Sequence, residues 1–305
     1  MINNKTIVLT GASSGIGFEV LRLFAKGEGN KILAVSRHAE QLLATFADNV
    51  IPFNMDISNK EGVDAVFEKA AEVFDGKKID IFYANAGFPY YEEFNYEDWD
   101  RVKAMFDTNT FSPIYTYAKY IHHLNGRDGI LAITVSAIGQ LAMPGYAIYS
   151  ASKFATQGFQ QAIRLEKPKN LQITTLYPVA TDTNFFRVAN PVEVEKPFPL
   201  QQPDVVARKM VAGIESGAKF VSPSPLFGLS KVLMGVCPPV RTVYWALENA
   251  KLNRFKEKLE TLRKDAAVVG KEALNFGKEA IEKGIDVVEE VVEKGKEAIE
   301  AALTK

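Results

Sequence analysis

Three side chains in the middle of the sequence have the types and the spacing of an acid–base catalyst. Ser136 precedes Tyr149 by thirteen residues, and Lys153 follows Tyr149 by four. Residues four apart lie on one helix face, so the Lys153 ammonium would lie near the Tyr149 phenol. A free tyrosine has a pKa of about 10, and a neighbouring cation lowers it, which makes the phenol a usable acid or base near neutral pH. A serine hydroxyl from a neighbouring strand end could hold a substrate oxygen. Alone, a Tyr-x-x-x-Lys pair is equally typical of an ordinary helix face.

A glycine-rich segment near the N-terminus could bind phosphate groups. Thr10-Gly11-Ala12-Ser13-Ser14-Gly15-Ile16-Gly17 follows an expected strand and precedes an expected helix. The first glycine permits a tight turn, and the other two permit close approach of the backbone to a pyrophosphate. Free N–H groups and the helix dipole would then stabilise the phosphates. A glycine-rich turn with only a structural role is the alternative interpretation.

The end of the second expected strand bears on the choice of cofactor. In dinucleotide-binding folds, an acidic residue at this point binds the ribose 2′-hydroxyl of NAD. Here the strand ends in Val35-Ser36-Arg37-His38, without an acidic residue. Arg37 can pair with a 2′-phosphate, which favours NADP(H) over NAD(H). The alternative is that Arg37 is a solvated surface arginine.

Strand-like and helix-like patterns alternate over the first 180 residues. Strands are expected at residues 5–10, 31–36, 50–54, 79–84, 130–136 and 171–177, with a final strand at 219–222. Helices are expected around residues 18–24, 62–74, 98–122 and 149–165, with a further helix after the second strand. This alternation predicts an α/β fold, a doubly wound parallel sheet of the Rossmann type, with ligands at the carboxyl ends of the strands.

Together these motifs resemble the short-chain dehydrogenase/reductase family, in its compact single-domain branch. The matching pieces occur in the family's order: residues 10–17, Asp56, Asn85-Ala86-Gly87, Asn109, Ser136, Tyr149-Ser150-Ala151-Ser152-Lys153 and residues 178–183, with a weaker match to about Ser222. The resemblance implies a catalytic set of Asn109, Ser136, Tyr149 and Lys153. Tyr149 would be the acid in carbonyl reduction and the base in alcohol oxidation, and Lys153 would also bind the nicotinamide ribose. Ser136 would orient the substrate oxygen, and Asn109 would hold a water of the proton relay.

The resemblance also implies which residues contact the cofactor. They are Gly11, Ser13, Ser14, Gly15, Ile16, Gly17, Arg37, Asp56, Ile57, Asn85, Ala86, Gly87, Tyr149, Lys153, Pro178, Thr181 and Thr183. Asp56 would contact the adenine, residues 85–87 would line the floor, and Thr183, with Thr181 beside it, would hold the nicotinamide carboxamide. The family usually has glycine after the proline of the last segment, whereas Val179 follows Pro178 here. This departure bears on the role of Thr183 and not on the catalytic set.

Bulky, mostly apolar residues are candidates for the substrate pocket. They are Phe88, Tyr90, Tyr91, Met143, Tyr146, Phe185 and Phe186. They favour a lipophilic carbonyl substrate, such as a fatty aldehyde, a keto-lipid or a steroid-like ketone; a place in the core or in a dimer interface is the alternative. Residues 184–204, rich in Pro and Phe, follow the sixth strand and are expected to form a substrate lid rather than a plain surface loop.

Residues 1–250 are expected to form the dinucleotide-binding domain, and residues 251–305 an amphipathic helical tail. The unit Gly-Lys-Glu-Ala begins at Gly270, Gly277 and Gly295, and apolar residues recur three or four positions apart. Seven lysines and ten acidic residues lie between positions 264 and 305. The tail is expected either to pack on its own domain or on another copy, or to attach reversibly to a membrane surface with help from the apolar run 226–237.

Composition argues against several other classes of protein. Lys and Arg number 36 and Asp and Glu 37, and this balance disfavours a nucleic-acid partner. The single cysteine excludes an internal disulfide, and the three histidines lack the spacing of a metal site. With no secretory pattern and no apolar run of 18 residues, a cytoplasmic protein is expected, with peripheral membrane attachment as an open question.

Two functional hypotheses from different classes follow. The first is an NADP(H)-dependent oxidoreductase that interconverts a small-molecule carbonyl and its alcohol, working as a homodimer or homotetramer. The second is a non-catalytic dinucleotide-binding scaffold or sensor, whose helical tail mediates membrane or partner attachment.

Overall fold

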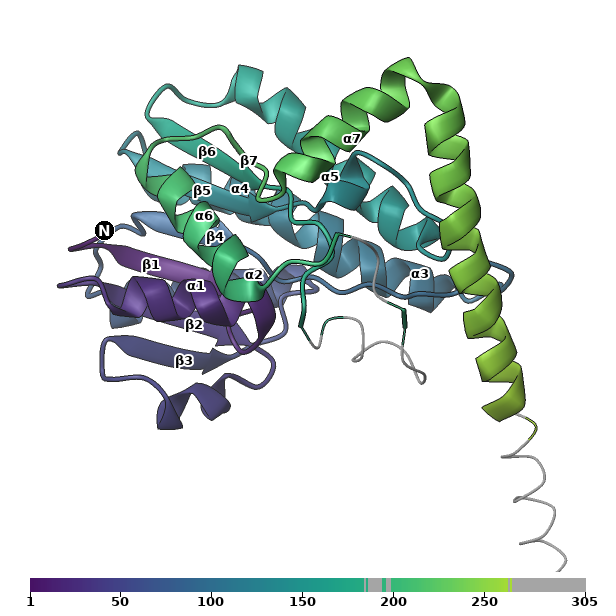
Figure 1. Ribbon diagram of the computed structural model, residues 1–305. Helices are drawn as coiled ribbons and strands as arrows, with labels where there is room; N and C mark the ends of the chain where they lie inside the picture. Colours follow the sequence, from purple (N-terminus) through teal and green to yellow (C-terminus); the bar gives the residue numbers. More distant parts are fainter. Residues whose placement is uncertain (184, 186–193, 196–198, 263, 265–305) are drawn as a thin grey trace, which may run out of the picture. The chain divides into compact units, whose positions relative to one another are not determined.

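The computed structural model describes residues 1–183, 185, 194–195, 199–262 and 264. The chain divides into two compact units, Met1–Asn253 and Arg254–Lys305. The first unit is an α/β domain (Figure 1). In the second unit, residues 254–262 are helical. The residues of the expected tail from 265 onward and most of the expected lid, including Phe186, lie outside the described residues.

A parallel sheet of seven strands forms the centre of the first unit. The strands are β1 (Thr6–Thr10), β2 (Lys31–Ser36), β3 (Val50–Asn54), β4 (Ile81–Ala84), β5 (Gly129–Thr134), β6 (Leu171–Leu176) and β7 (Phe220–Val221). Their order is β3-β2-β1-β4-β5-β6-β7, so the winding reverses between β1 and β4. Ligands of such sheets bind at this reversal, outside the carboxyl ends of the strands. The fold class predicted from the sequence is confirmed.

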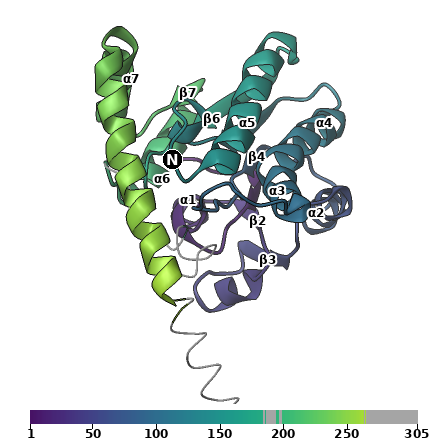
Figure 2. The same cartoon turned by 90° about the vertical axis from the view of Figure 1, so that its right-hand side faces the viewer.

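Helices cover both faces of the sheet (Figures 1 and 2). On one face lie α1 (Gly15–Ala25) and α6 (Pro203–Glu215), which bury Phe24 and Met210 against Leu9 of β1. On the other face lie α2 (Lys60–Val73), α4 (Ser112–Leu124) and α5 (Ala147–Glu166), which share a buried cluster with Val8. Neighbouring residues of β1 thus enter opposite cores, as the two-residue period of a strand requires. Helices α3 (Trp99–Phe106) and α7 (Pro225–Val236) and the helical residues 238–253 complete the unit as described.

The helix expected over residues 98–122 is interrupted. Helix α3 ends at Phe106, a π-helical turn covers Asp107–Phe111, and α4 begins at Ser112. The Ser112 N–H bonds to the Asp107 carbonyl, five residues back. Pro113 has no N–H to donate to the Asn109 carbonyl. That carbonyl accepts instead from the Thr156 hydroxyl of α5, at 2.8 Å. The proline therefore frees the carbonyl that ties the turn to the helix bearing Tyr149 and Lys153.

Two further expectations differ from the structure. The helix expected after β2 is a short 3₁₀ helix, Ala39–Ala44. The strand expected to reach Ser136 ends at Thr134, so Ser136 belongs to the following loop. Among the described residues, no helix is long and apolar enough to cross a bilayer.

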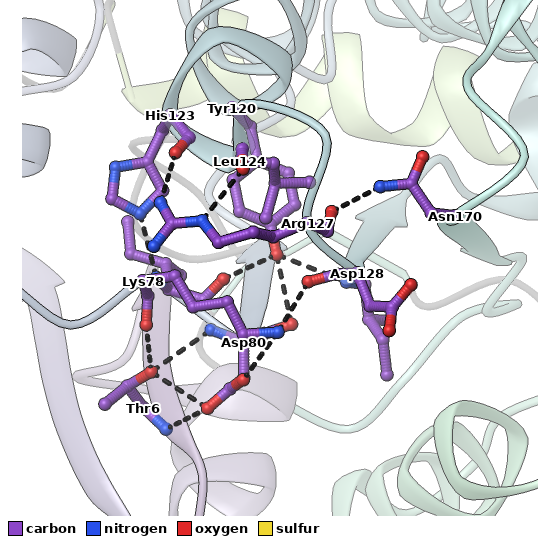
Figure 3. A network of polar contacts seen from close by, with 11 residues as sticks. Thr6, Lys78, Asp80, Tyr120, His123, Leu124, Arg127, Asp128 and Asn170 are labelled. Carbon is purple, nitrogen blue, oxygen red and sulfur yellow. Dashed lines mark hydrogen bonds and ion pairs between the residues drawn. The ribbon is translucent and has the colours of Figure 1, made fainter.

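A network of polar contacts closes the amino ends of β1 and β4 (Figure 3). The Asp80 carboxylate accepts hydrogen bonds from the Thr6 N–H and hydroxyl, each at 3.0 Å. The Tyr120 hydroxyl donates to the Ile79 carbonyl at 2.9 Å, and the Ile79 N–H donates to Nε2 of His123 at 2.8 Å. An imidazole nitrogen accepts a hydrogen bond only without its proton. This end of the sheet therefore needs a neutral His123.

Candidate active site

A cavity of about 740 Å³ lies over the carboxyl ends of the strands. Expected cofactor and catalytic residues on its wall are Gly11, Ser13, Ser14, Gly15, Ile16, Gly17, Arg37, Asp56, Ile57, Asn85, Ala86, Gly87, Ser136, Tyr149, Pro178, Thr181 and Thr183. Expected substrate residues on its wall are Phe88, Tyr90, Met143, Tyr146 and Phe185. Asn109 and Lys153 are buried and lie outside this lining. The loops after six strands, β1 to β6, thus bring most of the predicted site residues together.

The glycine-rich turn after β1 has the backbone that its glycines permit. Gly11 and Gly15 have φ angles of +67° and +57°, in the left-handed region that favours glycine. A Cβ on Gly17 would lie 2.0 Å from the Gly11 carbonyl oxygen, so no side chain fits there. The Asn85 amide donates to the Thr10 and Gly11 carbonyls, each at 3.3 Å. The turn is thereby fixed to the loop after β4, and α1 begins at Gly15 with its N-terminus at the cavity.

At the end of β2, two side chains offer unused hydrogen-bond donors. The Ser36 hydroxyl is buried and has no hydrogen-bond partner among the described residues. Arg37 is exposed, and no ion pair in the described part of the chain includes it. Both residues line the cavity, together with Asp56, whose carboxylate accepts the Ser58 N–H at 2.9 Å. This end of the cavity can therefore hold an anionic group.

Tyr149 and Lys153 lie on α5 with their functional groups close together. The Lys153 ammonium lies 5.9 Å from the centre of the Tyr149 ring and donates to the Thr134 carbonyl at 3.2 Å. Burial raises the pKa of Tyr149 above its usual value of 10, and a hydrogen bond with Ser136 opposes that rise. Burial lowers the pKa of Lys153 to about 8. Burial thus has the larger effect on the Tyr149 pKa, and a lowering of that pKa by Lys153 stays a prediction.

Ser136 has a strained backbone at the edge of the cavity. Its φ is +106° and its ψ is 151°, a conformation that non-glycine residues rarely adopt. Such strain costs on the order of 1–3 kcal/mol and occurs mostly at functional sites. The Ser136 hydroxyl accepts the Ile138 N–H at 3.3 Å and lies 3.4 Å from the Pro178 carbonyl. The loop after β5 thus places this hydroxyl beside Tyr149 at an energetic cost.

Asn109 is 1% exposed, and its side chain holds the loop after β4. Its amide nitrogen donates to the Phe88 carbonyl at 2.9 Å, and its amide oxygen accepts the Phe88 N–H at 3.1 Å. The same nitrogen lies 3.2 Å from the Ser152 hydroxyl of α5. Asn109 therefore positions both the cavity wall and the catalytic helix. Its role in holding a water of a proton relay stays a prediction.

Comparison with known proteins identifies the family. Residues 5–193 match the family model described as short chain dehydrogenase. The chain belongs to the short-chain dehydrogenase family. Oxidoreductase calM of Penicillium decumbens is 30% identical over 191 residues, which cover 60% of this chain and 63% of that protein. The chain thus matches less than two thirds of that relative's length.

Two further relatives are similar to this short-chain dehydrogenase, the first by comparison of sequences and the second by comparison of structures. A 3-dehydrosphinganine reductase of Danio rerio is 28% identical over 235 residues, covering 71% of this chain and 70% of that protein. An alcohol dehydrogenase from the archaeon Thermococcus sibiricus, solved with 5-hydroxy-NADP, superposes with a TM-score of 0.57 at 25% identity. That match covers 67% of this chain and 87% of the solved chain. The Rossmann architecture seen here is thus that of an oxidoreductase family.

Aromatic residues surround Tyr149 in this short-chain dehydrogenase. Tyr146 is 2% exposed, and its ring centre lies 6.0 Å from that of Tyr149. Its hydroxyl has no hydrogen-bond partner among the described residues, and burial raises its pKa well above the usual value. The Phe185 ring lies 6.1 Å from Tyr149, and the Arg101 guanidinium covers Tyr90 at 3.5 Å. Tyr91 packs against Tyr146 and does not belong to the cavity lining.

One wall of the cavity was not predicted as part of the site. It consists of Leu226, Phe227, Ser230 and Met234 of α7, and Tyr244 of the following helix. The Tyr244 hydroxyl contacts Sδ of Met143 at 3.7 Å, and the Trp245 indole donates to the Ala142 carbonyl at 2.9 Å. The apolar run 226–237 was the available signal, but it was expected only to help attach the tail to a membrane surface. The described residues contain no cluster of ligands for a metal ion.

Proposed function

We propose that this short-chain dehydrogenase is an NADP(H)-dependent oxidoreductase that reduces a lipophilic ketone or aldehyde to an alcohol, or catalyses the reverse reaction. The observation that carries the proposal is the placement of Tyr149 and Ser136 on the wall of a cavity that also contains the glycine-rich turn. A buried cation, Lys153, lies directly behind the tyrosine. A proton donor, an orienting hydroxyl and a dinucleotide cradle share one cavity.

The residues around the turn fit a nicotinamide dinucleotide. The N-terminus of α1 and the glycine backbone suit the pyrophosphate. The unpartnered Ser36 hydroxyl and the Arg37 guanidinium form a donor pair for a ribose 2′-phosphate, which favours NADP(H). The 5-hydroxy-NADP of the Thermococcus sibiricus relative supports this choice. When bound, the nicotinamide supplies or accepts the hydride at the substrate carbon.

The chain's own residues move the proton. Tyr149, whose pKa is raised by burial, keeps its proton at neutral pH and donates it to the substrate oxygen during reduction. The Ser136 hydroxyl holds that oxygen in line with the phenol. Lys153, with a pKa of about 8, is cationic at neutral pH and stabilises the phenolate that forms. Because the site is buried, this attraction is stronger than in water. In alcohol oxidation the same phenolate takes the proton.

The cavity wall favours a lipophilic substrate. Phe88, Phe185, Phe227 and Met234 present aromatic or apolar side chains to the space. The unpartnered Tyr146 hydroxyl would donate to a second oxygen of the substrate, near its carbonyl group. The name of the Danio rerio relative, a 3-dehydrosphinganine reductase, supports reduction of a lipophilic carbonyl compound.

The first test is a fluorescence titration of the full chain with NADPH and with NADH at fixed salt. Tighter binding of NADPH is expected, and Arg37→Ala should weaken NADPH binding by roughly 10- to 100-fold while leaving NADH unchanged, because one charged hydrogen bond to phosphate is lost. Arg208→Ala, at an exposed arginine of α6 outside the cavity lining, is the matched control. Preference for NADH would contradict the role of Arg37, and binding of neither would contradict the function.

The second test separates catalysis from binding. Tyr149→Phe should bind NADPH as the wild type does and reduce a panel of lipophilic carbonyls at least about 100-fold more slowly, since only the proton donor is removed. Equal turnover in this variant would refute the mechanism. The non-catalytic scaffold hypothesis predicts cofactor binding without turnover in the wild type itself.

A further inference from the structure

Helix α7 is apolar on two opposite sides. Its inner stripe lines the cavity and consists of Phe227, Ser230 and Met234. Its outer stripe follows the i, i+3, i+4, i+7 spacing of one helix face and consists of Leu229, Val232, Leu233 and Val236. These four side chains are 67, 62, 47 and 76% exposed. A surface helix of a globular protein normally carries polar residues on its outer face, so this stripe has the composition of a contact surface.

The apolar surface continues along the next helix of the same unit. Val243 and Leu247 are each 61% exposed. Between them, the half-buried Trp245 donates its indole N–H to the Ala142 carbonyl, and the Arg241 guanidinium lies 4.9 Å from its ring centre. Exposed aliphatic side chains around an anchored indole and a cation are typical of protein surfaces at a membrane–water interface.

Within residues 225–253, which carry this surface, the exposed charges are of one sign. Between positions 225 and 253, Lys231 and Arg241 are exposed cations. Lys231 bonds to the neutral amide oxygen of Gln140, at 2.8 Å, so its charge is not compensated there. The only acidic residue in this range is Glu248, which is buried and paired with Lys251 at 2.7 Å. A surface that is apolar and basic, without an exposed carboxylate, is complementary to anionic lipid.

We propose that the outer stripe of α7, together with Arg241, Val243 and Leu247, binds the surface of an anionic lipid bilayer. The opposite stripe of the same helix forms the cavity wall, so a single helix separates the lipid from the substrate cavity. The purpose of this arrangement, supply of a lipophilic substrate from the bilayer, rests on the proposed function. The docking itself depends only on the surface.

The test is co-sedimentation of the full chain with vesicles of phosphatidylcholine plus phosphatidylserine, and with vesicles of phosphatidylcholine alone. Binding to the mixed vesicles is expected, with a marked loss at high salt and a weaker signal on the neutral vesicles. The double variant Leu229→Glu/Val236→Glu should reduce partitioning at least tenfold. Both positions are exposed, so the substitutions bury no charge. Leu165→Glu is the matched control, because Leu165 is 91% exposed at the end of α5, and it should bind like the wild type.

Several outcomes would overturn the proposal. Absence of binding to the mixed vesicles would overturn it. Equal binding by the wild type and the double variant would also overturn it, because the contact with lipid would then lie elsewhere in the chain. Light scattering in the absence of lipid measures the oligomeric state of the wild type and of the double variant. A change from dimer to monomer in the double variant would make this stripe a subunit interface instead. NADPH titration of the same variant distinguishes the two proposals, because failure of docking leaves cofactor binding unchanged.

Discussion

Replacing Tyr146 by phenylalanine should make the protein more stable. The Tyr146 hydroxyl is buried without a hydrogen-bond partner among the described residues. A buried, unsatisfied polar group costs about 1–3 kcal/mol, and Tyr146→Phe removes that group while keeping the ring contacts with Tyr91 and Tyr149. The free energy of unfolding should rise by about 1–3 kcal/mol. For a unit of this size each kcal/mol raises Tm by about 2–4 °C, so Tm should rise by about 2–12 °C.

Differential scanning calorimetry of both proteins measures this shift. Tyr120→Phe is the matched control, because the Tyr120 hydroxyl donates to the Ile79 and Asp80 carbonyls at 2.9 and 3.0 Å. The control should lower the free energy of unfolding by about 1–3 kcal/mol, since partners are left unsatisfied. A lowered Tm for Tyr146→Phe would show that its hydroxyl is satisfied in the folded protein and would remove the reason to assign it to a substrate.

The same variant has a catalytic consequence. If the hydroxyl is retained to bind a second oxygen of the substrate, Tyr146→Phe should raise KM or lower kcat/KM for carbonyl substrates that carry such an oxygen. Matched substrates without it should be processed as by the wild type. A stability gain combined with equal losses on both kinds of substrate would refute the assignment, because the loss would then come from altered packing beside Tyr149.

Two pH-dependent predictions follow from buried bases. Because the pKa of Lys153 is lowered to about 8, the cation beside Tyr149 is lost above about pH 8, and kcat/KM for carbonyl reduction should fall there. Lys153→Met should reduce the carbonyl slowly, and its pH profile should lack this decline. Burial and Arg127 lower the pKa of His123 in the folded protein. As the pH falls, the His123 imidazole is therefore protonated at a higher pH in the unfolded chain than in the folded one, and the free energy of unfolding should fall between about pH 7 and 5. In urea titrations, His123→Gln should reduce the dependence of the free energy of unfolding on pH, and an unchanged dependence would contradict this role of His123. His122→Gln, at an exposed histidine, is the control.

The sequence predicts the sheet and most of the site because the relevant signals are local. Each strand appears as a short β-rich run, and Tyr149 and Lys153 are four residues apart on a continuous helix. The interruption at residues 107–111 is harder to predict, because no glycine or proline lies within it. Pro113 was visible in the sequence, but the partner of the carbonyl it frees, Thr156, is distant in the chain.

Other features depend on burial, which a single sequence does not show. Burial of the Tyr149 phenol, which raises its pKa, is one of them. Both stripes of α7 are apolar, so spacing alone does not distinguish the one that lines the cavity from the one exposed to solvent. The positive φ of Ser136 follows from the loop closing against the Pro178 segment, a contact between residues 42 positions apart.

The two walls of the cavity are held in place in different ways. The wall with Tyr149 and Ser136 is tied by hydrogen bonds to α5, the π-helical turn and the loops after β4 and β5, so a substitution there disturbs many partners at once. The wall formed by α7 is held through two buried side chains, Phe227 and Met234. Mutations at its other lining positions, Leu226 and Ser230, can alter the shape of the cavity while leaving the proposed proton donor in place. Substitutions along this one helix can therefore change which molecules fit the cavity, while the residues proposed to move the proton stay as they are.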